Sequence, residues 1–73
     1  MKIDKLIKMA NDISDFFDAE SNKELAAEGV KKHILRSWDP RMRKDIIQYY
    51  QTDGGKDLSS LAKAAVEKLA SCQ

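Results

Sequence analysis

The sequence predicts an all-α fold, a small bundle of three to four helices in one domain of residues 1–73. Apolar residues recur at the three- and four-residue spacing of a helix face in four stretches, and residues typical of helix starts and stops separate them. No stretch shows the alternating apolar and polar pattern of a half-buried strand. The predicted helices cover residues 3–18, 22–38, 40–51 and 59–70.

The first predicted helix, residues 3–18, carries a continuous apolar stripe. The positions expected to face the core are Ile3, Leu6, Ile7, Ala10, Ile13 and Phe17. Met9 and Phe16 lie one heptad apart on the edge of this stripe, and they widen the apolar arc beyond what a small core must use. We therefore expect Met9 and Phe16 to form a secondary apolar contact patch.

The second predicted helix, residues 22–38, is expected to begin with a capping box. In this motif Ser21 accepts a hydrogen bond from the backbone of the third helical residue, and Glu24 reaches back toward the cap. Apolar residues then follow at strict four-residue spacing, with His33 beside them: Ala26, Val30, Ile34 and Trp38. Gly29 costs a helix interior about 1 kcal/mol relative to alanine, which a close approach of another helix would explain.

The third predicted helix, residues 40–51, follows with essentially no linker. Asp39 favours the positive end of the helix dipole, and Pro40 lacks only an amide hydrogen that the first turn does not need. Gly54 and Gly55 end the helix, because glycine adopts the left-handed conformation freely. Its apolar arc consists of Met42, Ile46, Ile47, Tyr49 and Tyr50.

The fourth predicted helix, residues 59–70, has a narrow apolar stripe that is rich in alanine. Ser59 is the expected N-cap. Small side chains favour close packing of this helix in the bundle. The stripe consists of Leu58, Leu61, Ala62, Ala65, Val66 and Leu69.

Size and charge favour a partner-binding protein of the cytoplasm. At 73 residues, folding buries only about 60% of the surface of the unfolded chain, so a larger partner is a natural source of extra stability. The net charge of +1, with 34% charged residues, gives no strong pull toward nucleic acid or an anionic membrane. The single cysteine excludes an intrachain disulfide, and no apolar run approaches the ~20 residues of a membrane span.

The chain lacks the residue patterns of an enzyme or a metal site. One histidine and one cysteine, far apart in sequence, do not form a metal-binding motif. Asp12, Asp15 and Asp18 lie at three-residue steps on what we expect to be a solvated helix face, without the pocket that paired catalytic carboxylates need. We therefore expect no catalytic, metal-binding or cofactor-binding residues in this chain.

The segment Trp38-Asp39-Pro40-Arg41-Met42-Arg43 is the best candidate for partner binding, because tryptophan and arginine are enriched in interface hot spots. We expect Arg41 and Arg43 to pair with acidic groups of a partner, and Asp39 and Pro40 to hold them by fixing the helix start. Trp38 is equally well explained as the largest core residue. The predicted contact residues are Trp38, Asp39, Pro40, Arg41 and Arg43, with Met9 and Phe16 as the secondary patch.

A small helix-turn-helix regulator that binds nucleic acid is the alternative. Basic residues cluster around the junction of the second and third helices, and the third helix would present Arg41, Lys44, Gln48 and Gln51 to the major groove. Two observations argue against it: the turn lacks the usual glycine, and the chain is close to neutral. The basic cluster consists of Lys31, Lys32, Arg36, Arg41, Arg43 and Lys44.

Three segments follow one another along the chain: "LIKMANDISDFF" (Leu6 to Phe17), "HILRSWDPRMR" (His33 to Arg43) and "LSSLAKAAV" (Leu58 to Val66). In this order and at this spacing they resemble the delta subunit of NAD-dependent, molybdenum-containing formate dehydrogenases. The resemblance runs from Lys5 to about Val66. The chain departs from the family pattern mildly, in the stretch 44–50 and at Ser60, where a helix-starting proline is expected.

The resemblance implies a non-catalytic accessory subunit that supports assembly, stability or cofactor insertion through protein–protein contacts. The implied partner is the large molybdopterin-containing subunit, which oxidises formate. The partner subunits are expected to carry molybdopterin, iron–sulfur clusters, FMN and NAD, and this chain is expected to bind none of them. A homodimer of the isolated chain stays open, as does the question of whether the chain remains in the mature complex.

Overall fold

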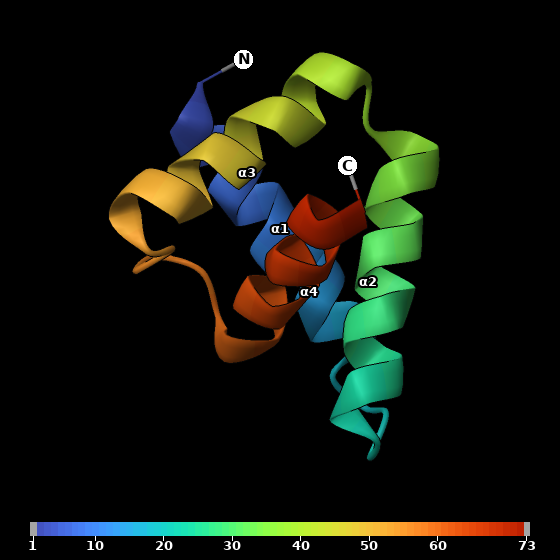
Figure 1. The fold of residues 1–73 in the computed structure, drawn as a ribbon. Coiled ribbons are helices and arrows are strands. Elements are labelled where there is room, and N and C mark those ends of the chain that lie inside the picture. Colours follow the sequence, from blue (N-terminus) through green and yellow to red (C-terminus); the bar gives the residue numbers. More distant parts are fainter. Residues whose placement is uncertain (1, 73) are drawn as a thin grey trace.

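The computed structural model describes residues 2–72 and confirms the all-α class. Its helices are α1 (Ile3–Phe17), α2 (Lys23–Ser37), α3 (Pro40–Asp53) and α4 (Ser60–Cys72), and the described residues include no strand. Helix α4 lies in the middle of the bundle and contacts each of the other three (Figure 1). Helix α1 also contacts α2 and α3, whereas α2 and α3 make few direct contacts with each other.

The core is centred on the alanine-rich face of α4. Ala62 and Ala65 have no exposed surface, and their small side chains let the neighbouring helices approach α4 closely. Fully buried side chains from the other three helices pack around this face, among them Leu6, Ile34 and Ile46. The whole chain has a radius of gyration of 10.8 Å.

Asn22, and not Ser21, caps helix α2, so the predicted capping box is wrong. The side-chain oxygen of Asn22 accepts hydrogen bonds from the backbone nitrogens of Glu24, at 3.0 Å, and Leu25, at 3.3 Å. Asparagine caps at least as well as serine, and here it satisfies two otherwise open N–H groups. Glu24 does not reach back to the cap, because its carboxylate accepts a hydrogen bond from Lys68 of α4 at 3.1 Å.

The other helix ends follow the predicted residues. Asp39 Oδ1 accepts a hydrogen bond from the backbone nitrogen of Met42 at 2.9 Å, and Pro40 is the first residue of α3. Helix α3 continues to Asp53, two residues beyond the predicted end, and stops at Gly54 and Gly55, whose φ angles are 75° and 69°.

Ser59 caps α4, as predicted. Its Oγ atom accepts a hydrogen bond from the backbone nitrogen of Ala62 at 3.2 Å. The helix itself begins at Ser60 and continues to Cys72, beyond the predicted end at residue 70.

Gly29 allows an aromatic side chain of α1 to lie directly on α2. A β-carbon at Gly29 would lie 2.7 Å from Cε1 and 2.9 Å from Cδ1 of Phe17. The expected close approach at Gly29 is therefore confirmed, and its cause is the ring of Phe17.

The loop between α3 and α4 is held by side chains from two helices. Asn11 of α1 donates a hydrogen bond to the carbonyl oxygen of Asp57 at 3.1 Å and accepts one from the backbone nitrogen of Ser59 at 2.8 Å. The hydroxyl of Tyr49 in α3 accepts a hydrogen bond from the backbone nitrogen of Asp57 at 3.0 Å. These three bonds fix the chain just before α4 begins.

The capping assignments lead to a test of stability. Asn22→Ala and Asp39→Ala are each expected to lower the free energy of unfolding by about 1 kcal/mol, because each leaves backbone N–H groups without an acceptor. Ser21→Ala is the matched control, with an expected change within about 0.5 kcal/mol. Urea unfolding followed by circular dichroism measures all three. A larger loss for Ser21→Ala than for Asn22→Ala would contradict the assignment.

Candidate functional site

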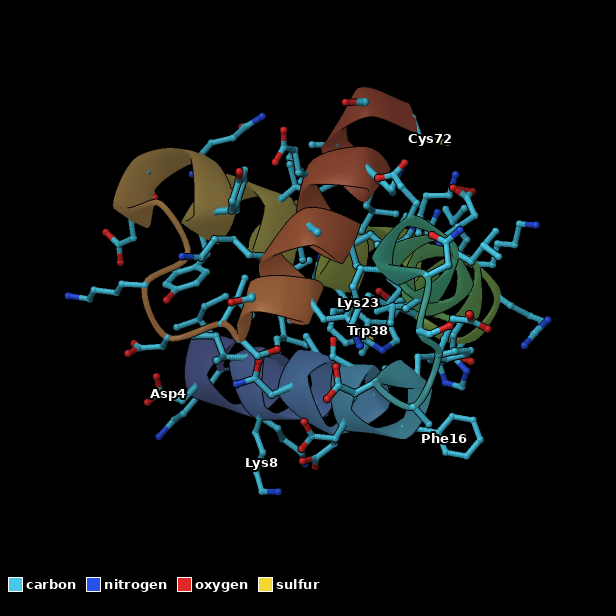
Figure 2. The ribbon with its side chains drawn as sticks, turned by 90° about the horizontal axis from the view of Figure 1, so that it is seen from below. Asp4, Lys8, Phe16, Lys23, Trp38 and Cys72 are labelled. Carbon is cyan, nitrogen blue, oxygen red and sulfur yellow. The ribbon has the colours of Figure 1, made fainter. Side chains whose placement is uncertain are left out.

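The turn between α2 and α3 consists of only Trp38 and Asp39. Trp38 is 4% exposed and belongs to the core cluster, so its ring packs inside the bundle (Figure 2). Asp39 and Pro40 are exposed at the start of α3. Within the predicted contact segment, Trp38 is therefore buried at the turn, whereas Asp39 and Pro40 lie on the surface.

The side chain of Arg43 reaches back to the turn that precedes α3. Its Nη1 atom donates hydrogen bonds to the carbonyl oxygens of Trp38, at 2.6 Å, and Leu35, at 3.4 Å. The last carbonyl groups of a helix have no partner within the helix, and a cationic side chain there also interacts favourably with the helix dipole. Arg43 thus has a role inside the chain that the sequence did not predict.

Arg41 is the arginine of the predicted pair that lies on the surface. It is exposed in the first turn of α3, whereas Arg43 is half-buried. Lys32 and Arg36 on α2 and Lys44 on α3 are exposed as well. None of these four exposed cations forms an ion pair with another residue in the described part of the chain.

Of the two residues predicted to form the secondary patch, Phe16 is exposed and Met9 is half-buried. Phe16 is 80% exposed, and its ring points away from the body of the protein (Figure 2). It lies edge-on to Phe17, with ring centroids 5.3 Å apart and an interplanar angle of 87°. Met9 is half-buried and packs against the core.

Leu25 is a second exposed large apolar side chain, at 60%, and sequence analysis missed it. It lies in the first turn of α2, outside the four-residue series that starts at Ala26. Its position outside that series could have indicated that the Leu25 side chain is exposed.

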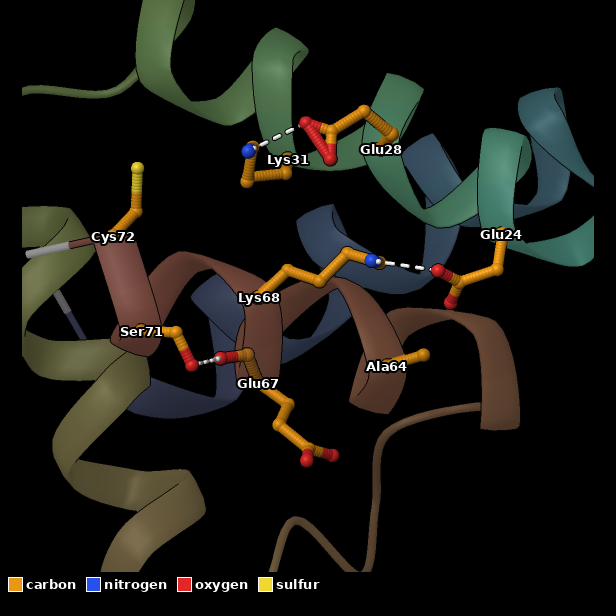
Figure 3. A pocket seen from close by; sticks show the side chains of 8 residues that line it. All are labelled: Glu24, Glu28, Lys31, Ala64, Glu67, Lys68, Ser71 and Cys72. Atoms are coloured by element: carbon orange, nitrogen blue, oxygen red, sulfur yellow. Dashed lines mark hydrogen bonds and ion pairs between the residues drawn. The ribbon is translucent and has the colours of Figure 1, made fainter.

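A charged groove of about 500 Å³ lies between α2 and α4 (Figure 3). Ion pairs occupy its walls: Lys68 with Glu24 at 3.1 Å, and Lys31 with Glu28 at 2.5 Å. The hydrogen bond between Lys31 and Glu28 lowers the pKa of the Glu28 carboxyl and raises the pKa of the Lys31 ammonium. The lining residues are Glu24, Glu28, Lys31, Ala64, Glu67, Lys68, Ser71 and Cys72.

This groove has the character of a surface ion-pair network. The hydrogen bond from Lys31 lowers the pKa of the Glu28 carboxyl and so favours its charged form, which is the opposite of what a general acid requires. Within residues 2–72, no group of three or more histidine, cysteine, aspartate or glutamate side chains could hold a metal ion. No helix in that range is long and apolar enough to cross a membrane.

A sequence model of the family described as NADH-dependent formate dehydrogenase delta subunit FdsD matches residues 5–66 of the 73-residue chain. All three segments that carry the resemblance lie within the matched range, so the match confirms it. No curated protein and no solved structure shows significant similarity to the chain. None of these findings supports the helix-turn-helix alternative.

The positions of the two arginines lead to a matched pair of variants. Arg43→Ala is expected to lower the free energy of unfolding by about 1–3 kcal/mol, because it removes charged hydrogen bonds to two backbone carbonyl groups. Arg41→Ala is expected to change it by no more than about 0.5 kcal/mol, since Arg41 is exposed. Urea unfolding of the purified variants measures both values. Equal stability of the two variants would show that Arg43 does not secure the turn.

Proposed function

The chain belongs to the family of NADH-dependent formate dehydrogenase delta subunits, and from this we propose that it is a non-catalytic accessory subunit of such a complex. Its proposed partner is the large molybdopterin-containing subunit, reached through protein–protein contacts in the cytoplasm. Its proposed role is to support assembly, stability or cofactor insertion. The family match over residues 5–66 is the observation that carries the proposal.

The side-chain chemistry of the chain supports a non-catalytic role. An iron–sulfur cluster is commonly held by four cysteines, whereas this sequence has one cysteine and one histidine. In the charged groove between α2 and α4 the acidic side chains Glu24 and Glu28 are held in ion pairs, and the hydroxyl of Ser71 donates its hydrogen bond to the backbone carbonyl oxygen of Glu67, at 3.2 Å, and not to a side-chain base. We therefore assign molybdopterin, the iron–sulfur clusters, FMN and NAD to the partner subunits.

The small size of the bundle supports docking onto a larger subunit. A domain of this length is marginally stable alone, and a partner that binds only the folded chain adds to its stability by mass action. The surface offers an exposed aromatic ring, Phe16, and exposed arginines, Arg36 and Arg41, which are residue types suited to an interface.

Affinity purification tests the proposal. The tagged full-length chain is expressed in its native cells, grown with formate and molybdate, and the purified material is analysed by mass spectrometry. We expect the large molybdopterin-containing subunit and the NAD-reducing subunits in fixed ratios to the chain. An untagged strain taken through the same steps is the control. Recovery of the chain without these subunits would contradict the proposed function.

A further inference from the structure

We propose that the chain docks onto its partner through the α1–α2 edge, which consists of Met9, Ile13, Phe16, His33 and Arg36. The partner surface that fits this edge is an apolar pocket with carboxylates at its rim. This inference rests on the proposed function and adds to it the docking surface and the chemistry of the partner's receptor.

Phe16 is the anchor of this edge. Burial of an aromatic ring is favourable in proportion to the apolar area removed from water, yet this ring is 80% exposed. Among residues 2–72, Phe16 and Leu25 are the only large apolar side chains classed as exposed. The ring of Phe16 lies edge-on to that of Phe17, an arrangement that aromatic pairs prefer, and its outer face is open to a partner.

The apolar surface is continuous along α1. Met9, Ile13 and Phe16 follow one another at steps of four and three residues, so they lie on one flank of the helix. Met9 and Ile13 are half-buried against the core, whereas Phe16 is exposed. A partner that receives Phe16 can therefore also cover the outer parts of the two half-buried side chains.

The edge continues from α1 onto α2 through Phe17. The ring of Phe17 lies on Gly29 and is 6.5 Å, between centroids, from the ring of His33. Arg36 follows His33 by three residues and is its neighbour on the helix surface. These contacts of Phe17 join the end of α1 to the part of α2 that carries His33 and Arg36, and on this ground we assign Phe16 and Arg36 to one surface.

The charges of this surface indicate an acidic partner. Arg36 and Lys32 are exposed on α2, and in the described part of the chain neither forms an ion pair. On the α1 side, Asp12 is paired with Lys8 at 3.0 Å and Asp18 with Lys23 at 3.2 Å, which leaves the exposed Asp15 against the two cations of α2. The positive charge on the α2 side of the edge therefore complements carboxylates on the partner, which an arginine can bind through two parallel hydrogen bonds.

A second copy of this chain is a poor receptor for Phe16. Phe16 projects from the surface and requires a concave apolar site. Each of the described grooves is lined by ionised side chains, including Asp18 in the two smaller grooves and Glu28 in the largest. Insertion of a phenyl ring there would remove charged groups from water, which is costly even where those groups form ion pairs.

Competition between two copies of the chain tests the edge. A tagged Phe16→Ser variant and the untagged original chain are produced together in native cells, and their ratio in the purified formate dehydrogenase complex is measured by mass spectrometry. We expect the variant to be disfavoured by about 10-fold or more, as for an interface hot spot. Tagged chain without a substitution gives the reference ratio. Thermal unfolding of the free variant checks that it is folded. We expect it to be folded, because the exposed side chain of Phe16 contributes little to the core.

Charge reversal tests the second half of the edge. Arg36→Glu is expected to be disfavoured in the same competition, because it opposes the partner's carboxylates, with a penalty that shrinks as salt is raised. Lys56→Glu makes the same charge change on the exposed loop between α3 and α4, and is expected to compete equally with the original chain. Equal incorporation of Phe16→Ser and the original chain would overturn the proposal.

A photo-crosslinking residue placed at position 16 identifies the receptor directly. We expect crosslinks to an apolar segment of the large subunit that contains aspartate or glutamate. Crosslinks to a second copy of the chain would overturn the proposal. Entry of the original chain into the complex, with equal entry of the Phe16 variant, refutes the docking surface alone. Failure of the original chain to enter any complex refutes the proposed function and the docking surface with it.

Discussion

The hydrogen bonds from Arg43 in α3 to backbone carbonyl groups at the end of α2 hold these two helices together at the turn that joins them. Helices α2 and α3 make few direct contacts with each other, although both pack on α4, so the two-residue turn is the main direct connection between them. Asp39 closes the start of α3, while Arg43 reaches back to the carbonyl groups of Leu35 and Trp38. The open ends of both helices at this turn thereby gain hydrogen-bond partners, which lets the chain change direction without a glycine.

The residues that hold this bundle together and those offered to a partner lie in different places. Trp38 and Arg43 are engaged inside the chain, in the core and at the turn respectively. Phe16 contributes little to the core, and Arg36 forms no ion pair within the described residues. Because of this separation, substitutions at the α1–α2 edge can change association without unfolding the protein, whereas substitutions at the turn act through stability.

The sequence was sufficient for the helices and the core because both depend on local periodicity. The alanine stripe of α4, the Asp39 cap and the Gly54-Gly55 stop are local patterns, and the structure contains all three. The features that were missed depend on which distant groups meet. Asn11 binds a loop more than forty residues away, and nothing in its own neighbourhood indicates that contact.

At the candidate site, too, the sequence predicts what depends on neighbouring residues and misses what depends on contacts between helices. The arginine spacing in the segment 38–43 does not reveal that only Arg41 stays exposed, because that depends on the path of the turn. The exposure of Phe16 could be anticipated from its place at the edge of the apolar stripe, whereas its continuity with α2 required the contact of Phe17 with Gly29.

The single tryptophan of the chain also gives the α2–α3 turn a built-in spectroscopic reporter. Trp38 is 4% exposed, and its ring lies among core side chains at the point where the two helices meet. Indole fluorescence shifts to shorter wavelength in apolar surroundings, so the emission of the folded chain reports the packing of this one turn. Because Phe16 is on the surface and Trp38 in the interior, occupation of the α1–α2 edge leaves the indole in its apolar surroundings, and only loosening of the core exposes it to water.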